Sequence, residues 1–249
     1  MRADDVLQLM RTAPQRYETV RATLVYRGDG TKIRAVRERY ARSEAGRHTF
    51  GDSPDEVWHP EPDSEFGWRC RIWRVDENQW RQELELPGGG TSIVVSTGRI
   101  RPFGTPEGPP GSSEMWELRT GEGSQEADPA WLIHPTDVFW TMYPFDPAGT
   151  ASIDAELGRM ELTVEEGISW AERDAVRLRG VPVGEWEYPP EPLWWGADEY
   201  EAVVDAERGV LLRLASRFDG GDIDALEVEE VRFDEPFDEE IFASRAPLP

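Results

Sequence analysis

The sequence predicts a mainly β (α+β) protein built on one large, curved antiparallel sheet with a few short helices. Two observations carry this prediction. At least eight segments alternate apolar with polar side chains or form short apolar runs, as strands do. Short turns containing Gly, Asp or Asn join several neighbouring segments, which is typical of antiparallel pairing.

The N-terminal part contains two candidate helices on either side of a strand. The first helix has Asp4 as its capping acid and is stopped by Pro14. Residues 17–27 alternate and predict a strand. Strong helix formers over residues 33–46 favour a second helix, although the alternation at the start of this segment also fits a strand.

A meander of three strands follows the loop at residues 51–67. The strands are predicted at residues 68–75, 79–86 and 91–97. In the middle strand, Trp80 and Leu84 share one face, and the opposite face carries Arg81, Glu83 and Glu85.

Further strands are predicted over the rest of the chain, at residues 115–118, 160–164, 175–178 and 225–233, with a hairpin at residues 200–218 that turns at Gly209. Residues 128–145, rich in aromatics and broken by prolines, predict one or two short helices packed on the sheet. Two stretches rich in Pro and Gly, residues 102–114 and 182–197, are expected to be flexible loops within a single domain that spans residues 1–249.

The chain is acidic, with 50 Asp and Glu against 27 Lys and Arg and a net charge of -23. This charge argues against nucleic-acid binding through phosphate contacts. It is also uneven, because residues 1–50 hold eleven bases and six acids whereas residues 198–249 hold five bases and sixteen acids. The two ends are expected to attract each other, to form solvated faces, or to leave an acidic surface for a basic partner.

Hydropathy and the N-terminus predict a soluble, cytoplasmic protein. No apolar run approaches the roughly 18 residues that a membrane-spanning helix requires. The first residues also lack the basic and apolar regions of a signal peptide.

The sequence holds no catalytic or metal-binding signature, so we expect a non-enzymatic protein without metal or cofactor. Cys70, the single cysteine, has the strand parity of Ile72, which indicates a packed thiol. The three histidines lack metal-ligand spacing. His134 lies close to Asp137 in the sequence, and it is the one histidine that we would test for a catalytic role.

Tryptophan is the strongest compositional signal, with eleven residues spread over several strands and both loops. Two interpretations stay open: the indoles fill the core of a curved sheet, or they line an apolar cavity for a hydrophobic ligand. For the second interpretation, the candidate ligand-binding residues are Trp80, Trp131, Trp140, Trp73, Trp116, Trp194 and Trp195.

The hairpin YEAVVDAERGVLLRLASRF (200–218) and the segment EVEEVRFDEPFDEEIF (227–242) resemble the closing strands of the LolA-like superfamily. The segments WRCRIWRVDENQWRQELEL (68–86) and DPAWLIHP (128–135) resemble earlier parts of the same pattern. That superfamily comprises lipoprotein carriers and the N-terminal domains of RseB-type regulators. The resemblance implies a half-open β-barrel with helices as a lid, and it transfers no individual binding residue.

These features predict a non-enzymatic protein that holds a hydrophobic or lipid-like ligand in the concave face of the sheet. The N-terminal helix and residues 128–145 would cover that face, and the two Pro- and Gly-rich loops would gate it. The alternative is a regulatory or scaffold module whose acidic C-terminal face docks a basic protein partner.

Overall fold

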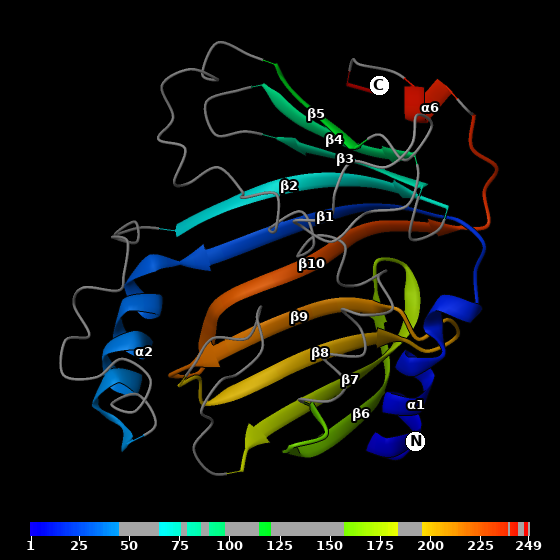
Figure 1. Ribbon diagram of the computed structural model, residues 1–249. Helices are drawn as coiled ribbons and strands as arrows, with labels where there is room; N and C mark the ends of the chain where they lie inside the picture. The colour runs from blue at the N-terminus through cyan, green and yellow to red at the C-terminus, as the bar shows by residue number, and fades with distance from the viewer. Residues whose placement is uncertain are drawn as a thin grey trace, which may run out of the picture. The chain divides into compact units, whose positions relative to one another are not determined.

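A single open sheet forms the framework of the protein (Figure 1). The computed structural model describes residues 1–44, 65–75, 79–85, 90–97, 115–120, 157–183, 196–238, 240–243 and 247–248, with the backbone alone at 96–97 and 115–120. Ten strands lie in the order β5-β4-β3-β2-β1-β10-β9-β8-β7-β6, and the pairs from β2 to β5 and from β10 to β6 are antiparallel. The predicted mainly β class with one antiparallel sheet is confirmed.

The chain divides into two compact units, each described by itself below. The first unit comprises residues 1–14, 25–67 and 143–228. The second comprises residues 15–24, 68–142 and 229–249.

The first unit begins with helix α1 (Ala3–Arg11), which confirms the predicted N-terminal helix. Its cap differs from the prediction by one residue, because Asp5 rather than Asp4 accepts the backbone N–H of Arg2, at 3.0 Å. The buried side chains of this helix are Val6, Leu7 and Met10.

Strand β1 (Val20–Asp29) leads directly into helix α2 (Gly30–Arg42). The Asp29 carboxylate accepts the backbone N–H groups of Thr31 and Lys32 at 3.0 and 3.1 Å, so it caps the helix. The helical interpretation of this segment is confirmed, because a strong cap and apolar side chains at helical spacing decide against the short alternation at its start.

Five strands complete the sheet of this unit: β6 (Met160–Trp170), β7 (Arg173–Pro182), β8 (Glu199–Asp205), β9 (Leu211–Phe218) and β10 (Gly221–Phe233). Their register shifts at three places, at Glu165/Ile168, Val203/Val204 and Asp222/Asp224. Such bulges bend the strand that carries them, and β8 and β9 are visibly bowed in Figure 1. The predicted hairpin turn at Gly209 is confirmed by its φ of 76°.

The core of the first unit lies between one face of these strands and both helices. Its central members are Val6, Leu7 and Met10 from α1, Ile33 and Val36 from α2, and Val176, Leu178, Tyr200, Ala202, Val204, Leu211 and Leu214 from the strands. Gly209 shows how tightly α1 is seated, because a Cβ at this position would lie 2.3 Å from the carbonyl oxygen of Leu9. The helix-covered face is therefore a filled core.

The second unit contains the predicted meander. It consists of β2 (Glu65–Arg74), β3 (Gln79–Glu85), β4 (Thr91–Thr97) and β5 (Met115–Thr120), followed near the C-terminus by the short helix α6 (Glu240–Ala243). Phe242 of α6 packs with Trp73, Ile93 and Val95 on one face of the strands. The predicted helices at residues 128–145, the loop at residues 102–114 and most of the loop at residues 182–197 lie outside the described residues.

Candidate functional site

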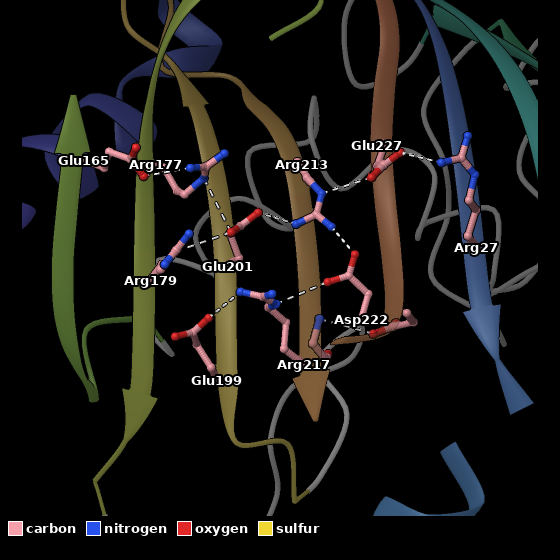
Figure 2. A network of polar contacts seen from close by, with 12 residues as sticks. Arg27, Glu165, Arg177, Arg179, Glu199, Glu201, Arg213, Arg217, Asp222 and Glu227 are labelled. Carbon is pink, nitrogen blue, oxygen red and sulfur yellow. Dashed lines mark hydrogen bonds and ion pairs between the residues drawn. The ribbon is translucent and has the colours of Figure 1, made fainter. Parts of the chain in front are cut away.

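Charged side chains cross the face of the first unit that lies opposite its helices (Figure 2). We call this set the charged ladder: Arg27, Glu165, Arg177, Arg179, Glu199, Glu201, Arg213, Arg217, Asp222 and Glu227. The strand register places these residues on one face, because cross-strand partners share a face and Arg213 is paired with Val203 and Glu227. Their neighbours along β8 and β9, such as Ala202 and Leu214, point to the core.

Arg213 is the centre of the charged ladder. Its guanidinium forms ion pairs with Glu201, with Asp222 and, at 3.0 Å between Nε and Oε1, with Glu227. The side chains of Arg213 and Glu201 are only 7% and 8% exposed. Trp170 adds a cation–π contact, with its ring centroid 5.6 Å from the Arg213 guanidinium carbon.

The outer members of the ladder extend these contacts towards both sides. Arg177 approaches Glu165 at 2.7 Å and Glu201 at 3.4 Å. Arg217 approaches Glu199 at 2.9 Å. Each of the five arginines thus has at least one carboxylate partner within the ladder, which also contains five carboxylates.

The electrostatics of Arg213 follow from these partners. Burial acts to lower its pKa, but the hydrogen bond to Glu227 and the charges of Asp222 and Glu201 outweigh burial and raise the pKa above its ordinary value. Arg213 therefore stays cationic, and its charge is matched within the chain. This internally neutral ladder joins neighbouring strands and does not present a net charge to a ligand.

Ion pairs also explain the uneven charge of the sequence. Arg39 of α2 contacts Asp198 at 2.6 Å, and Arg27 of β1 contacts Glu227 at 3.2 Å. Two ion pairs therefore join the basic first fifty residues to the acidic segment at residues 198–249, as one of the expected alternatives has it. Docking of a basic partner through the acidic C-terminal face stays a prediction.

In the second unit, charged side chains are buried together with Trp73. Arg81 and Glu83 are 0% and 1% exposed and form an ion pair at 2.6 Å. Arg81 donates to the carbonyl oxygen of Ile241 in α6 at 2.9 Å, and the backbone N–H of Leu248 donates to Glu83 at 2.9 Å. This pair satisfies backbone groups of the C-terminal segment, so Arg81 and Glu83 are as buried as Trp80 and Leu84 on the apolar face.

The opposite face of the meander is formed by buried side chains from β2, β3 and β4. We call it the Trp80 face: Cys70, Ile72, Arg74, Trp80, Gln82, Leu84, Ser92 and Val94. Its rows are set by the register, which aligns Cys70 with Leu84 and Ser92, Ile72 with Gln82 and Val94, and Arg74 with Trp80. The predicted packed thiol of Cys70 is confirmed, because its side chain is fully buried on this face.

Gln82 occupies the middle row of the Trp80 face. The residue is 1% exposed, and its side-chain amide oxygen Oε1 meets no hydrogen-bond donor among the residues that the structure describes. A buried acceptor without a donor is uncommon, because its lost hydration is not replaced. The face therefore combines the apolar side chains of Ile72, Trp80, Leu84 and Val94 with the polar side chains of Arg74, Gln82 and Ser92, all of them buried.

The structure separates the two predicted ligand-binding tryptophans whose side chains it describes. Trp73 is paired with Arg81, and Trp80 with Arg74, so the two indoles lie on opposite faces of the same hairpin. They cannot line one surface together. The backbone of Trp116 lies in β5, opposite Val95. Trp131, Trp140, Trp194 and Trp195 lie outside the described residues, as do His134 and Asp137.

Sequence patterns did not reveal Gln82 or the charged ladder. Gln82 has the strand parity of Trp80, which was visible, but polar residues on strands are usually solvated. The alternation of Arg and Glu in β7 to β10 was also visible, yet charged residues are common throughout this chain. Only the register shows that these particular residues meet.

Two searches of the described part of the chain gave negative results. Within it, no group of three or more His, Cys, Asp and Glu side chains is placed to hold a metal ion. None of the described helices is long and apolar enough to cross a membrane.

No protein-family model matches the chain, and neither does any curated protein. Among solved structures, MucB in complex with MucA(peri) is 15% identical, with a TM-score of 0.49 over 98% of this chain and 60% of that chain. The MucA/MucB complex of Pseudomonas aeruginosa is matched at 15% identity and a TM-score of 0.47, over 96% and 60%. This chain thus spans about 60% of the length of those matched chains. A LolA superfamily protein from Nitrosomonas europaea, of the kind that the sequence resembles, is matched at 8% identity and a TM-score of 0.28, over 97% of both chains.

Proposed function

We propose that this chain is a non-enzymatic binding protein that holds a hydrophobic ligand against the Trp80 face of its second unit. The observation that carries the proposal is the composition of that face. It brings Ile72, Trp80, Leu84 and Val94 together around Gln82, whose amide oxygen has no donor among the described residues. A surface on which apolar side chains are combined with a few polar ones suits a ligand that is mostly hydrocarbon.

The two surfaces of the first unit are less suitable for such a ligand. Its helix-covered face is already packed against α1 and α2, through Met10, Ile33 and Val36. Its other face carries the charged ladder, whose carboxylates and guanidinium groups would lose hydration beneath an apolar molecule. The Trp80 face is therefore the better candidate within the described residues.

Contact between the ligand and the Trp80 indole contributes enough free energy for its loss to be measured as a change in binding affinity. Burial of apolar surface contributes about 25 cal/mol per Å², so about 100 Å² of ligand contact contributes about 2.5 kcal/mol. Replacement of Trp80 by leucine removes part of this contact while keeping the site apolar. We expect it to weaken ligand binding about tenfold, as about 1.4 kcal/mol of lost contact would do.

The hairpin offers a matched control, because Trp73 and Trp80 are both 3% exposed but lie on opposite faces. Trp80→Leu and Trp73→Leu should lower thermal stability to similar extents. Isothermal titration with 1-decanol should show weakened binding for Trp80→Leu and binding within about twofold of the parent protein for Trp73→Leu. Equal weakening in both variants would show that the effect is on folding rather than on the ligand.

Native mass spectrometry and solvent extraction of the purified protein provide a second test. A co-purifying apolar molecule, lost in Trp80→Leu but retained in Trp73→Leu, would support the proposal. Absence of any bound molecule, together with no heat of binding for 1-decanol, would reject it.

A further inference from the structure

Strand β6 forms an outer edge of the sheet (Figure 1). It pairs with β7 on its inner side, and no strand in the described part of the chain pairs with its outer side. The backbone groups that point outwards from such a strand are a template for a further strand. The register shift at Glu165/Ile168, where Gly167 has a φ of 72°, interrupts the template. Its regular part is residues 160–165, which we call the β6 edge.

The side chains of the β6 edge alternate between two chemistries. Glu161, Thr163 and Glu165 are exposed and lie on the face of the charged ladder, to which Glu165 belongs. Leu162 and Val164 point to the other face, where they are half-buried against the core. An added strand would therefore meet acidic or hydroxyl side chains on one face and apolar side chains on the other.

Exposed apolar residues gather at the same border of the first unit. Val181 of β7 is paired with Glu161 and is 48% exposed, and Val183 is 60% exposed. Met1 is 48% exposed, and its amino group forms an ion pair with Glu166 of β6. Within the described residues, these three are the large apolar residues that are exposed. A partner chain at the β6 edge thus has apolar surface beside it.

The charge of β6 selects the kind of strand that can be added. The strand contains three acidic residues and no basic one. The nearest arginines of the charged ladder, Arg177 and Arg179, lie on β7, the next strand inwards. A strand added outside would lie about 5 Å from β6 and about 10 Å from β7. Its side chains would therefore meet the glutamates first, which favours Arg or Lys on that face.

The same charges argue against a second copy of this chain as the added strand. Antiparallel pairing of two β6 edges about Thr163 would place Glu161 of each copy opposite Glu165 of the other. Like charges directly opposite each other destabilise a strand pair. The added strand is therefore expected to come from a different protein.

We propose that the β6 edge binds an extended segment of a partner protein as an additional strand, in which Arg or Lys alternates with apolar residues. Backbone hydrogen bonds would provide affinity, and Glu161 would provide the preference for a basic strand. This surface is separate from the Trp80 face, so the inference goes beyond the proposed function and does not depend on it.

The first experiment compares two fluorescein-labelled peptides of identical composition. In one, Arg alternates with Val, and in the other all arginines precede all valines, so that only the first matches the two faces of β6. Fluorescence anisotropy should show that the parent protein binds the alternating peptide more tightly, by about fivefold or more. Hydrogen exchange read by mass spectrometry should show slower exchange of backbone amides at residues 160–165 when this peptide is present.

The second experiment reverses one charge at the site and one elsewhere. Glu161→Arg should weaken binding of the alternating peptide about fivefold, because an attraction is replaced by a repulsion. Glu18→Arg in the second unit is the matched control, since Glu18 is also exposed and its replacement changes the net charge equally. Binding to this variant should stay within about twofold of the parent protein. Both variants should keep the Tm of the parent.

Each contrary result overturns a defined part of the inference. If the alternating peptide does not bind, or binds no more tightly than its isomer, β6 does not accept a strand and its bulge and charges only protect the edge. Slower exchange outside residues 160–165 alone would place the peptide elsewhere. Equal weakening in Glu161→Arg and Glu18→Arg would assign the attraction to net charge rather than to Glu161. None of these results bears on the binding of 1-decanol to the Trp80 face.

Discussion

The two units of this protein use the faces of their strands differently. In the first unit two helices cover one face, and the other carries the charged ladder, in which Arg177, Arg179 and Arg217 have ion-pair partners although their buried Nε atoms form no hydrogen bond with a described residue. In the second unit, α6 and the pair Arg81–Glu83 complete one face. The other face retains an acceptor, on Gln82, that no described residue satisfies.

This difference shows which buried polar residues are explained by their role in folding and which are not. A buried charge with oppositely charged partners can specify a register, and Arg213 has this character because it forms ion pairs with Glu201, Asp222 and Glu227. A buried polar group without a partner costs free energy, and such a cost is expected where a second molecule is meant to bind. Substitutions of buried polar residues in the two units should therefore change the free energy of unfolding in opposite directions and by different amounts.

The largest effect is expected for Arg213→Ala in the first unit. Loss of the guanidinium leaves Glu201 buried with a weakened set of partners, which typically costs about 3–5 kcal/mol in the free energy of unfolding. Urea denaturation measures this loss. The control is Arg232→Ala, which removes exposed ion pairs with Glu230 and Glu235 and should leave the urea midpoint unchanged. Equal midpoints for the two variants would mean that the ladder is not structural.

An intermediate effect of opposite sign is expected for Gln82→Met in the second unit. The substitution replaces a buried, unsatisfied amide with a thioether of similar shape, so the penalty of about 1–3 kcal/mol for the unpaired acceptor is relieved. Thermal unfolding of the ligand-free protein should show a higher Tm than that of the parent. A lower Tm would indicate that Gln82 contributes to the fold through contacts that methionine cannot make.

The smallest effect concerns the ion pair between α2 and Asp198. Burial acts to raise the pKa of Asp198, but hydrogen bonds from the backbone N–H of Asp219 and from Arg39 outweigh it, so the pKa lies below its ordinary value. A depressed pKa in the folded state gives stability that is present above the unfolded pKa of about 4 and is lost as the pH falls through the folded value.

Asp198→Asn should therefore lower stability at pH 7, by about 0.5 kcal/mol, because the pair is half exposed. The difference from the parent protein should shrink as the pH is lowered from 4 to 3, where the parent loses the same charge. Urea midpoints at pH 7, 4 and 3 measure both quantities. A difference that is constant over this range would show that the charge of Asp198 does not matter.

Much of the fold could be predicted because local patterns and local chemistry agreed. The meander at residues 68–97 alternates and turns at short loops, so its three strands were found nearly to the residue. The hairpin at residues 200–218 was found for the same reason, with Gly209 at positive φ in its turn. Boundaries were less accurate, because pairing in the sheet extended β6 to Trp170 and β7 to Pro182 beyond their apolar cores.

The candidate site was predicted less well, for a physical reason. Parity placed Trp80 on one face of its strand, but it could not show how Trp73 on the neighbouring strand was aligned with it. That alignment depends on register, and the register puts Arg74 rather than Trp73 opposite Trp80. Gln82 is buried because other parts of the chain pack around β3. The alternation pattern of one strand carries no information about those parts.

The sequence by itself determined the class of this protein: strand periodicity, turn residues and helix caps act over a few residues and can be read in order. The sequence also showed a basic N-terminal and an acidic C-terminal region, for which mutual attraction was one of three expectations. The tertiary structure alone decided which charges pair, which tryptophan shares a face with Gln82, and which polar atom is left without a partner. Those outcomes depend on contacts between residues far apart in the chain, where a shift of one position in register exchanges the two faces of a strand.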